Sequence, residues 1–180
     1  MGAEVFFSTE RLTVRPMRPE DVDAFVAYRS DPEVARYQSW SDYTLEQGRS
    51  LVAEMQGLRP GVPGEWVQLA IDDGTGLVGD LATCVDPDEH RQLEVGFTLA
   101  PEHQGKGYAT EALHGLLGHA FATLAMHRVV AITDARNDAA AALLRRVGFR
   151  QEAHFRDNVF FKGAWGSELL FAMLQSEWTG

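Results

Sequence analysis

The sequence predicts an α/β fold of the α+β kind, in which helices lie on both faces of one mixed β-sheet. From Ala109 to Leu124, apolar residues recur every three or four positions, which is the pattern of a helix with one buried stripe. Short runs rich in β-branched and aromatic residues lie before and after this helix, and Asp73-Gly74-Thr75-Gly76 between two of them favours a hairpin turn. Because no segment of the sequence has the composition of a linker, we expect a single domain over residues 1–180.

The first half of the chain is predicted to contain a strand, two helices and a pair of strands. Proline and acids at residues 19–21 are typical of a first helical turn, and Thr44 and Gln47 have the spacing of a capping box. The bounds of the predicted strands follow from alternating apolar residues and from the turn residues between them. The predicted elements are the strand 11–17, the helices 19–30 and 44–58, and the strands 65–72 and 77–85.

The second half alternates strands and helices and ends in two strands. Gly148 is placed to end a helix, and the turn 162–166 separates the last two strands. The predicted elements are the strand 92–99, the helix 108–124, the strand 128–133, the helix 137–147 and the strands 149–161 and 167–174. The whole chain is thus expected to form about seven strands and about four helices.

Composition limits the partners and the chemistry. The formal net charge is −10, with no basic patch, which argues against nucleic-acid binding and mildly favours a cationic partner. Cys84 is the only cysteine, so a thiolate metal cluster is excluded, and the histidines show no metal-ligand spacing. Without a signal peptide, a lipidation motif or a long apolar run, the protein is expected to be cytoplasmic and not membrane-bound.

Residues 93–110 predict an anion-binding site. A strand leads into a short loop with Gly105, Lys106 and Gly107, and the loop opens the long amphipathic helix. The first N–H groups of a helix have no internal partner, and glycines let that backbone approach an anion closely. Two familiar phosphate loops do not match. A Walker loop needs Ser or Thr after the lysine, and a dinucleotide loop needs a small residue where Thr110 stands.

The segment Gln104-Gly105-Lys106-Gly107-Tyr108-Ala109 resembles the Gln/Arg-x-x-Gly-x-Gly/Ala signature of the GCN5-related N-acetyltransferases, the GNAT family. The segments 9–12, 15–16 and 108–112, together with Asn137 and Gly148-Phe149, resemble the branch named for RimJ and RimL. This resemblance implies a mostly antiparallel GNAT sheet that splays at an acetyl-CoA site. It implies acetyl transfer directly from the thioester to an amine.

The resemblance also implies which residues would bind acetyl-CoA. The strand backbone near Phe97, Thr98 and Leu99 would hold the acetyl and pantetheine portion. The loop and helix start would hold the pyrophosphate, and Asn137 and Arg146 would contact the rest of the molecule, although Asn137 also fits a helix N-cap. The loop and helix-start residues are Gln104, Gly105, Lys106, Gly107, Tyr108, Ala109 and Thr110.

Glu94 is the candidate general base, because alternation puts it on the polar face of the cofactor strand. Glu111 also matches the family pattern but is interpreted as structural. Related enzymes carry a Ser or a Tyr where this chain has Ala140 and Leu144, and neither of these side chains can protonate the leaving thiolate. What replaces that general acid stays open at this point.

Tyr37, Trp40 and His154 are candidates to line the acceptor site. The acceptor itself is left open among a cationic peptide, a ribosomal-protein N-terminus, a polyamine and an aminoglycoside, and the protein could be a monomer or a homodimer. Two alternatives to the acetyltransferase remain. The loss of the general acid would suit a non-catalytic acyl-CoA-binding sensor, and a strand followed by Asp134 leaves a Rossmann-type NAD-dependent enzyme as a weaker one.

Overall fold

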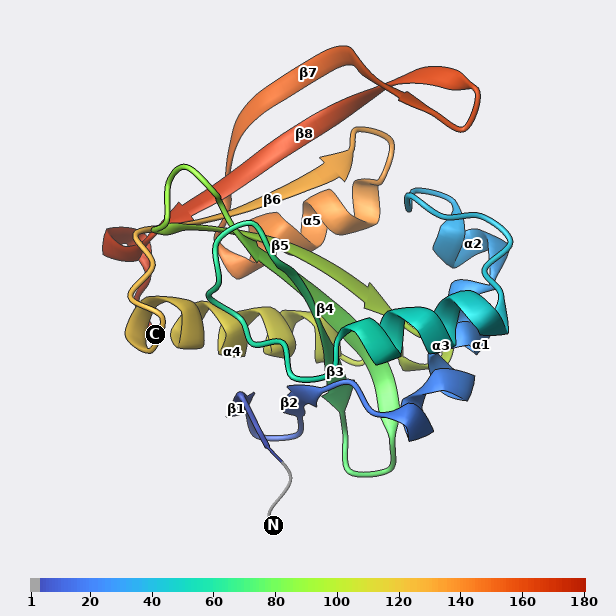
Figure 1. Ribbon diagram of the computed structural model, residues 1–180. Coiled ribbons are helices and arrows are strands. Elements are labelled where there is room, and N and C mark those ends of the chain that lie inside the picture. Colours follow the sequence, from blue (N-terminus) through green and yellow to red (C-terminus); the bar gives the residue numbers. More distant parts are fainter. Residues whose placement is uncertain (1–3) are drawn as a thin grey trace.

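The structure is a computed structural model that describes residues 4–180, and it contains an eight-stranded sheet with helices on both faces (Figure 1). The strand order is β1-β2-β3-β4-β5-β6-β8-β7. The strands are β1 Phe7–Ser8, β2 Thr13–Pro16, β3 Trp66–Asp72, β4 Leu77–Val85, β5 Gln92–Leu99, β6 Arg128–Asp134, β7 Arg150–Phe161 and β8 Ala164–Leu174. The helices are α1 Val22–Arg29, α2 Pro32–Ala35, α3 Leu45–Glu54, α4 Tyr108–Ala122 and α5 Asp138–Val147. Among the strands of residues 4–180, only β5 and β6 pair in parallel, which confirms a mixed, mostly antiparallel sheet.

Two short elements, β1 and α2, account for the difference from the predicted seven strands and four helices. β1 has two residues, which is too short to show alternation. α2 is a single turn that begins at Pro32, and its N-cap Asp31 accepts a hydrogen bond from the Glu33 N–H (2.8 Å). One helical turn is shorter than the period that reveals a buried stripe, so the sequence pattern gave no signal for it.

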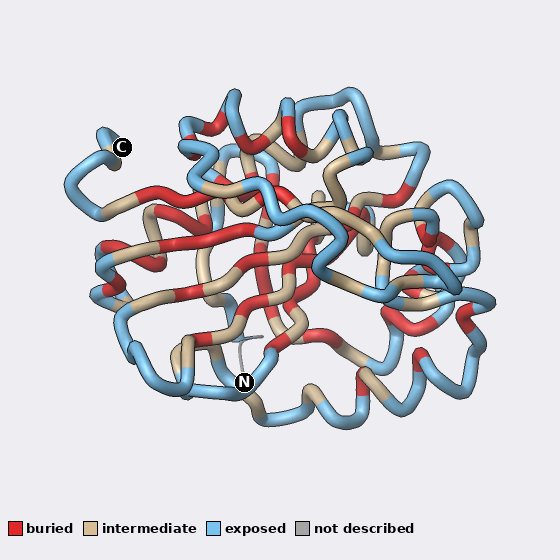
Figure 2. The backbone as a smooth tube through the Cα atoms, turned by 90° about the horizontal axis from the view of Figure 1, so that it is seen from above, coloured by how far each residue is buried: buried red, intermediate tan, exposed pale blue. Residues whose placement is uncertain are grey.

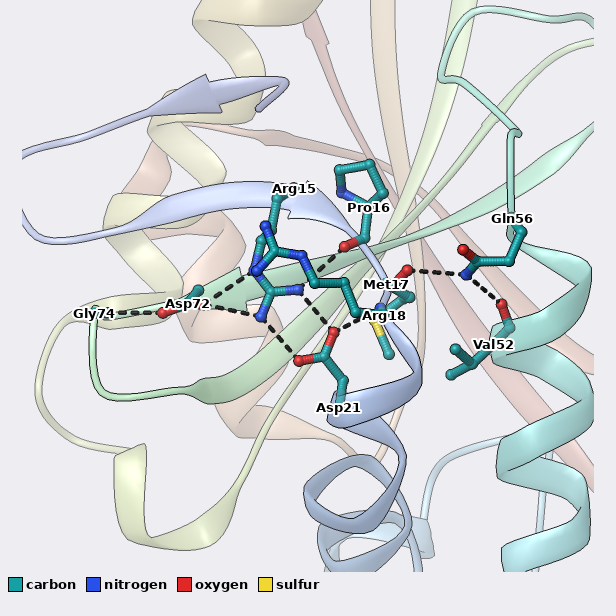
Figure 3. Close-up of polar contacts among 9 residues, drawn as sticks. All are labelled: Arg15, Pro16, Met17, Arg18, Asp21, Val52, Gln56, Asp72 and Gly74. Carbon is teal, nitrogen blue, oxygen red and sulfur yellow. Dashed lines mark hydrogen bonds and ion pairs between the residues drawn. The ribbon is translucent and has the colours of Figure 1, made fainter. Parts of the chain in front are cut away.

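The capping box correctly predicted where α3 begins but not where it ends. Gln47 and Thr44 exchange two hydrogen bonds, of 2.8 and 3.2 Å, across the first turn. The helix stops at Glu54, short of its predicted end. Just beyond it, the Gln56 side chain donates to the Met17 carbonyl (3.0 Å), which ties the end of α3 to the segment after β2 (Figure 3).

Alternation along the strands divides the buried side chains between two faces, here called the back face and the front face. α4 and α5 cover the back face, and the predicted stripe of α4 lies in the core beneath them. Its buried members are Ala112, Leu113, Leu116, Leu117, Ala120 and Phe121. On the front face, α1 and α3 enclose a smaller core around Phe25, next to residues of β3 and β4. Buried segments run through the central strands, while most connecting segments are exposed (Figure 2).

β5 and β6 separate after a short paired stretch. Their parallel register covers only Gln92 with Arg128, Leu93 with Val129 and Glu94 with Val130. Beyond that point β5 remains paired with β4 alone, and β6 remains paired with β8 alone. The predicted splay is therefore confirmed, and it leaves one edge of the second half of β5 without a neighbouring strand.

A buried cluster of ion pairs fixes α1 against the sheet (Figure 3). Arg15 of β2 is 4% exposed, and its guanidinium donates to both carboxylate oxygens of Asp21 (2.7 and 2.8 Å). The same group donates to Asp72 of β3 (3.0 and 2.8 Å). Asp21 also accepts from the Arg18 N–H (2.8 Å) in the turn before α1. These contacts set the position of α1, whose last residue, Arg29, lines the front pocket described below.

The β7–β8 hairpin extends past the end of the sheet toward α2 (Figure 1). At its turn, the Lys162 ammonium donates to the Ala35 carbonyl (2.6 Å), so the two distant segments are in contact. Across the part of the chain that the structure describes, none of the helices is both long and apolar enough to cross a membrane.

Candidate active site

Two cavities meet where β5 and β6 separate. The first, here called the groove, has a volume of about 770 Å³ and follows the end of β5, the loop before α4 and the starts of α4 and α5. The second, the front pocket, has a volume of about 600 Å³ and lies on the front face of β4, β5, β6 and β8. Six residues line both cavities and form what we call the junction: Tyr37, Gln38, Phe97, Thr98, Asn137 and Ala140.

The loop before α4 presents backbone N–H groups to the groove. Gly105 and Gly107 have φ values of +73° and +83°, a conformation that residues with a Cβ rarely adopt. The N–H groups of residues 108–110 begin α4 and have no partner within the helix. The Gln104 side chain donates to the Leu99 carbonyl (3.1 Å) and so holds the loop against the end of β5. The result is a concave backbone surface with positive potential.

An ion pair supports this loop from outside the groove. Arg11 donates to the Lys106 carbonyl (3.0 Å) and forms an ion pair with Glu111 (2.6 Å). Glu111 also accepts from the Thr9 hydroxyl (2.6 Å), so the contacts agree with its structural interpretation. Lys106 itself does not line the groove. It lies in the exposed loop between the two glycines, and only its carbonyl takes part in the contacts described here.

The other residues expected at the cofactor site all line the groove. They are Phe97, Thr98, Leu99, Gln104, Gly105, Gly107, Tyr108, Ala109, Thr110, Asn137 and Arg146. Asn137 also caps α5, because its side-chain oxygen accepts from the Ala140 N–H (3.1 Å). Both interpretations of Asn137 are thus compatible with one position.

Small residues form the floor of the front pocket. In the β4–β5 register, Ala82 lies opposite Gly96, between the pairs formed by Asp80 with Thr98 and by Cys84 with Glu94. Opposed side chains share a face of the sheet, so the absence of bulk at Ala82 and Gly96 leaves a hollow between the flanking polar groups. Aromatic residues form much of the wall around it: Tyr37, Trp40, Trp66 and Phe161.

Glu94 lies in this pocket, where alternation along the strand had placed it. Burial raises the pKa of its carboxyl, and the nearby Glu168 and Asp86 carboxylates raise it further. Among residues 4–180 we find no hydrogen bond to the Glu94 carboxylate, whereas Glu168 accepts one from the Asn158 amide (2.6 Å). A partly buried carboxylate without a partner in a cavity is a suitable proton acceptor.

Arg29 and Asp80 form a second polar group of the pocket, which the sequence analysis missed. Asp80 is 1% exposed, pairs with Arg29 (3.2 Å) and accepts from the Tyr28 hydroxyl and the Gln68 amide. The Arg29 guanidinium also lies against the Trp40 ring, 3.9 Å from its centroid. The sequence offered one signal for this polar group, because Asp80 is an acid within the otherwise apolar run 77–85, and an acid in such a run is buried only when it is paired.

Of the three predicted acceptor residues, Tyr37 and Trp40 line the front pocket, but His154 lines neither cavity. A bulge after Gln151 shifts the β7 register so that His154 pairs with Leu169. Leu169 belongs to the back core, so His154 is on the opposite face of the sheet from the pocket. This part of the prediction was wrong, because a bulge reverses the faces and leaves no clear mark in the sequence.

The two positions where a general acid was sought have different surroundings. Ala140 belongs to the junction, whereas Leu144 is completely buried in the back core and reaches neither cavity. Within residues 4–180, no group of three or more His, Cys, Asp or Glu side chains is arranged to hold a metal ion.

Comparison with known proteins agrees with this geometry. Residues 11–150 match the family model described as the acetyltransferase (GNAT) domain. An uncharacterized N-acetyltransferase, p20 of Bacillus licheniformis, is 30% identical over 96% of this chain and 97% of its own. The crystal structure of a GNAT-family acetyltransferase from Bacillus anthracis has a TM-score of 0.86 at 26% identity, covering 95% of this chain and 99% of that one.

For a further solved structure, the similarity to this chain extends to the fold alone. The spermidine N-acetyltransferase of Vibrio cholerae, solved in complex with CoA and spermine, has a TM-score of 0.79 at 22% identity, over 93% of this chain and 97% of its own. The family model covers most of the sequence, and the Bacillus licheniformis relative matches almost end to end. The chain therefore belongs to the GNAT family of acetyltransferases.

Proposed function

We propose that this acetyltransferase transfers an acetyl group from acetyl-CoA directly to the primary amine of a cationic acceptor. The observation that carries the proposal is the junction, where a groove with unpartnered helix N–H groups opens into a pocket lined by carboxylates. An anionic cosubstrate and a cationic acceptor can enter from opposite sides and meet there. Holding both reactants in place supplies a large part of the rate enhancement of such a reaction.

The groove fits a long molecule with phosphates at one end and a thioester at the other. The N–H groups at the start of α4 would hold the diphosphate, since a helix N-terminus favours negative charge. The unpaired edge of β5 near Phe97 and Thr98 would bind the amides of the pantetheine arm. Arg146 lines the same groove and would add a positive charge for a further phosphate.

Replacing Gly105 with alanine should weaken CoA binding about tenfold. No other atom lies within 4 Å of the added Cβ, so the cost comes from the backbone, whose φ of +73° disfavours alanine by about 1–2 kcal/mol. We expect the free variant to leave this conformation, so that binding must restore it at that cost. Titration calorimetry with CoA measures the effect. Gly118→Ala is the matched control: this glycine lies within α4, also has open space around it and should keep wild-type affinity. Equal affinity for both variants would contradict the proposed phosphate site.

The residues of the front pocket carry the proton chemistry. An acceptor enters as an ammonium ion and must lose a proton before its nitrogen can attack the thioester carbonyl. Glu94 accepts this proton, directly or through water. The new N–C bond then forms as the C–S bond breaks, and the sulfur leaves with the bonding electron pair. The acylated nitrogen loses its second proton to solvent, which gives the neutral amide.

The pocket suits a cationic acceptor. Glu94, Asp134 and Glu168 supply carboxylates, and aromatic faces such as Trp66 attract alkylammonium groups. Asp134 is already paired with Arg136 (2.6 Å), which leaves Glu94 and Glu168 as the acids without a cationic partner among the described residues. Polyamines, aminoglycosides and basic peptides, including ribosomal-protein N-termini, are the matching classes. The spermine complex of the Vibrio cholerae relative makes polyamines the first class to test.

The test is release of free thiol from acetyl-CoA in the presence of spermidine, an aminoglycoside, a basic amino-terminal peptide or an amino acid, with the product identified by mass. We expect turnover that depends on the amine, and none with the fully N-acetylated form of the same acceptor. Stabilisation by CoA without turnover on the whole panel would favour the acyl-CoA sensor instead. Stabilisation by NAD but not by CoA would favour the oxidoreductase.

A further inference from the structure

The leaving thiolate needs a proton, and the side chains around α5 do not provide one. A thiol such as that of CoA titrates near pH 8.5, so at neutral pH the departing sulfur ends as a thiol. Ala140 lines the junction from the first turn of α5 but carries no exchangeable proton. A proton donor must therefore come from another element that reaches the same place.

The junction contains four side chains with a hydrogen-bond donor: Tyr37, Gln38, Thr98 and Asn137. Carboxamides such as those of Gln38 and Asn137 donate hydrogen bonds but do not give up a proton, and an aliphatic hydroxyl such as that of Thr98 is a very weak acid. A phenol gives up a proton more readily than a carboxamide or an aliphatic hydroxyl does. Tyr37 is therefore the junction residue that carries a transferable proton.

The surroundings of Tyr37 also suit a proton donor. It follows α2, is half-buried and lines both cavities, and its hydroxyl has no hydrogen-bond partner among residues 4–180. Two guanidinium groups lie near its ring, Arg36 at 5.3 Å and Arg136 at 5.9 Å from the centroid. Asp134 fixes Arg136 through an ion pair of 2.6 Å. These contacts hold the Tyr37 ring in place at the junction.

We propose that Tyr37, on the segment between α2 and α3, protonates the thiolate of CoA as the thioester bond breaks. The step is balanced within the proposed reaction, on which this inference rests. The C–S electron pair goes to sulfur, the phenol O–H bond breaks, and an S–H bond forms. Solvent returns a proton to the phenolate before the next turnover. The proton taken by Glu94 and the second proton lost by the acylated nitrogen leave to solvent, so that each turnover releases one proton.

Tyr37→Phe tests the role, because it removes the hydroxyl and keeps the ring beside Arg136. We expect kcat to fall by about 10²-fold, with unchanged CoA affinity and unchanged KM for acetyl-CoA, because the proton is needed only in the transition state. The dependence of kcat on pH should also differ between the wild type and the variant, because only the wild type carries the phenol. Tyr43→Phe is the control, since this tyrosine lines neither cavity, and its kcat should remain close to wild type.

A second substitution separates loss of the proton donor from disturbance of the junction. Ala140→Cys in the Tyr37→Phe background places a thiol, whose acidity matches that of the leaving group, at the junction from α5 and should restore at least tenfold of the lost kcat. A Tyr37→Phe variant with wild-type kcat and pH profile would overturn the role of Tyr37 while leaving the acetyltransferase proposal intact. Absence of turnover by the wild-type enzyme on every acceptor would overturn both.

Discussion

Replacing Glu94 with glutamine should lower kcat by about 10²–10⁴-fold, the range expected when a general base is removed. Glutamine keeps the size and hydrogen-bonding capacity of the side chain but cannot accept the ammonium proton. CoA affinity should stay unchanged, since Glu94 lines the front pocket and not the groove. Steady-state thiol release and CoA calorimetry on the same preparation measure the two quantities. A variant with near-wild-type kcat would remove Glu94 from the mechanism.

The pH profile gives an independent check on the same residue. Glu94 must be ionised to accept a proton, and its pKa is raised by burial first and by the Glu168 and Asp86 carboxylates second. Its ionised fraction therefore declines as the pH falls through a value above that of an ordinary glutamate. We expect kcat to decline on the acidic side in that range. Glu168→Gln removes one like charge, so it should move this limb to lower pH.

Most of the fold could be predicted because its signals are local. The α4 stripe, the Thr44 capping box and the turn at 73–76 each lie within one helix or hairpin, and each was placed correctly. The splay followed from the family resemblance and appears in the register of β5 and β6. Three features gave no signal because they are too short to show a pattern. β1 is a strand of two residues, α2 is one helical turn, and the β7 bulge is a single inserted residue.

The two cavities also differed in how far local sequence could predict them. The groove is built largely from residues 97–110, so one segment of sequence revealed it. The front pocket instead combines α1, β4, β5, β6 and β8, and Arg29, Asp80 and Glu168 come together only through tertiary packing. Arg29 and Glu168 look like ordinary surface charges when their neighbours along the chain are considered alone, and only Asp80, within an apolar run, carries a local signal. Recognising the front pocket therefore required the structure, while recognising the groove did not.

Replacing Arg15 with methionine should lower the free energy of unfolding by about 3–5 kcal/mol, the cost of breaking a buried ion pair by removing one partner. Arg15 and Asp21 are 4% and 5% exposed, so Asp21 would be left buried without a cation. Methionine fills much of the same volume, which keeps a packing loss from explaining the effect. Urea denaturation at neutral pH measures the change through the transition midpoint at constant m-value.

The control for this experiment is an ion pair of the same chemistry at the surface. Arg36 and Glu33 are 3.7 Å apart with side chains 60% and 82% exposed, so Arg36→Met should cost less than about 1 kcal/mol. Asp21→Asn combined with Arg15→Met should cost less than the two single changes together, because it removes the uncompensated charge. If Arg15→Met cost no more than the surface control, the cluster would not be what fixes α1. In that case the position of Arg29 in the front pocket would have to depend on the apolar contacts of α1 alone.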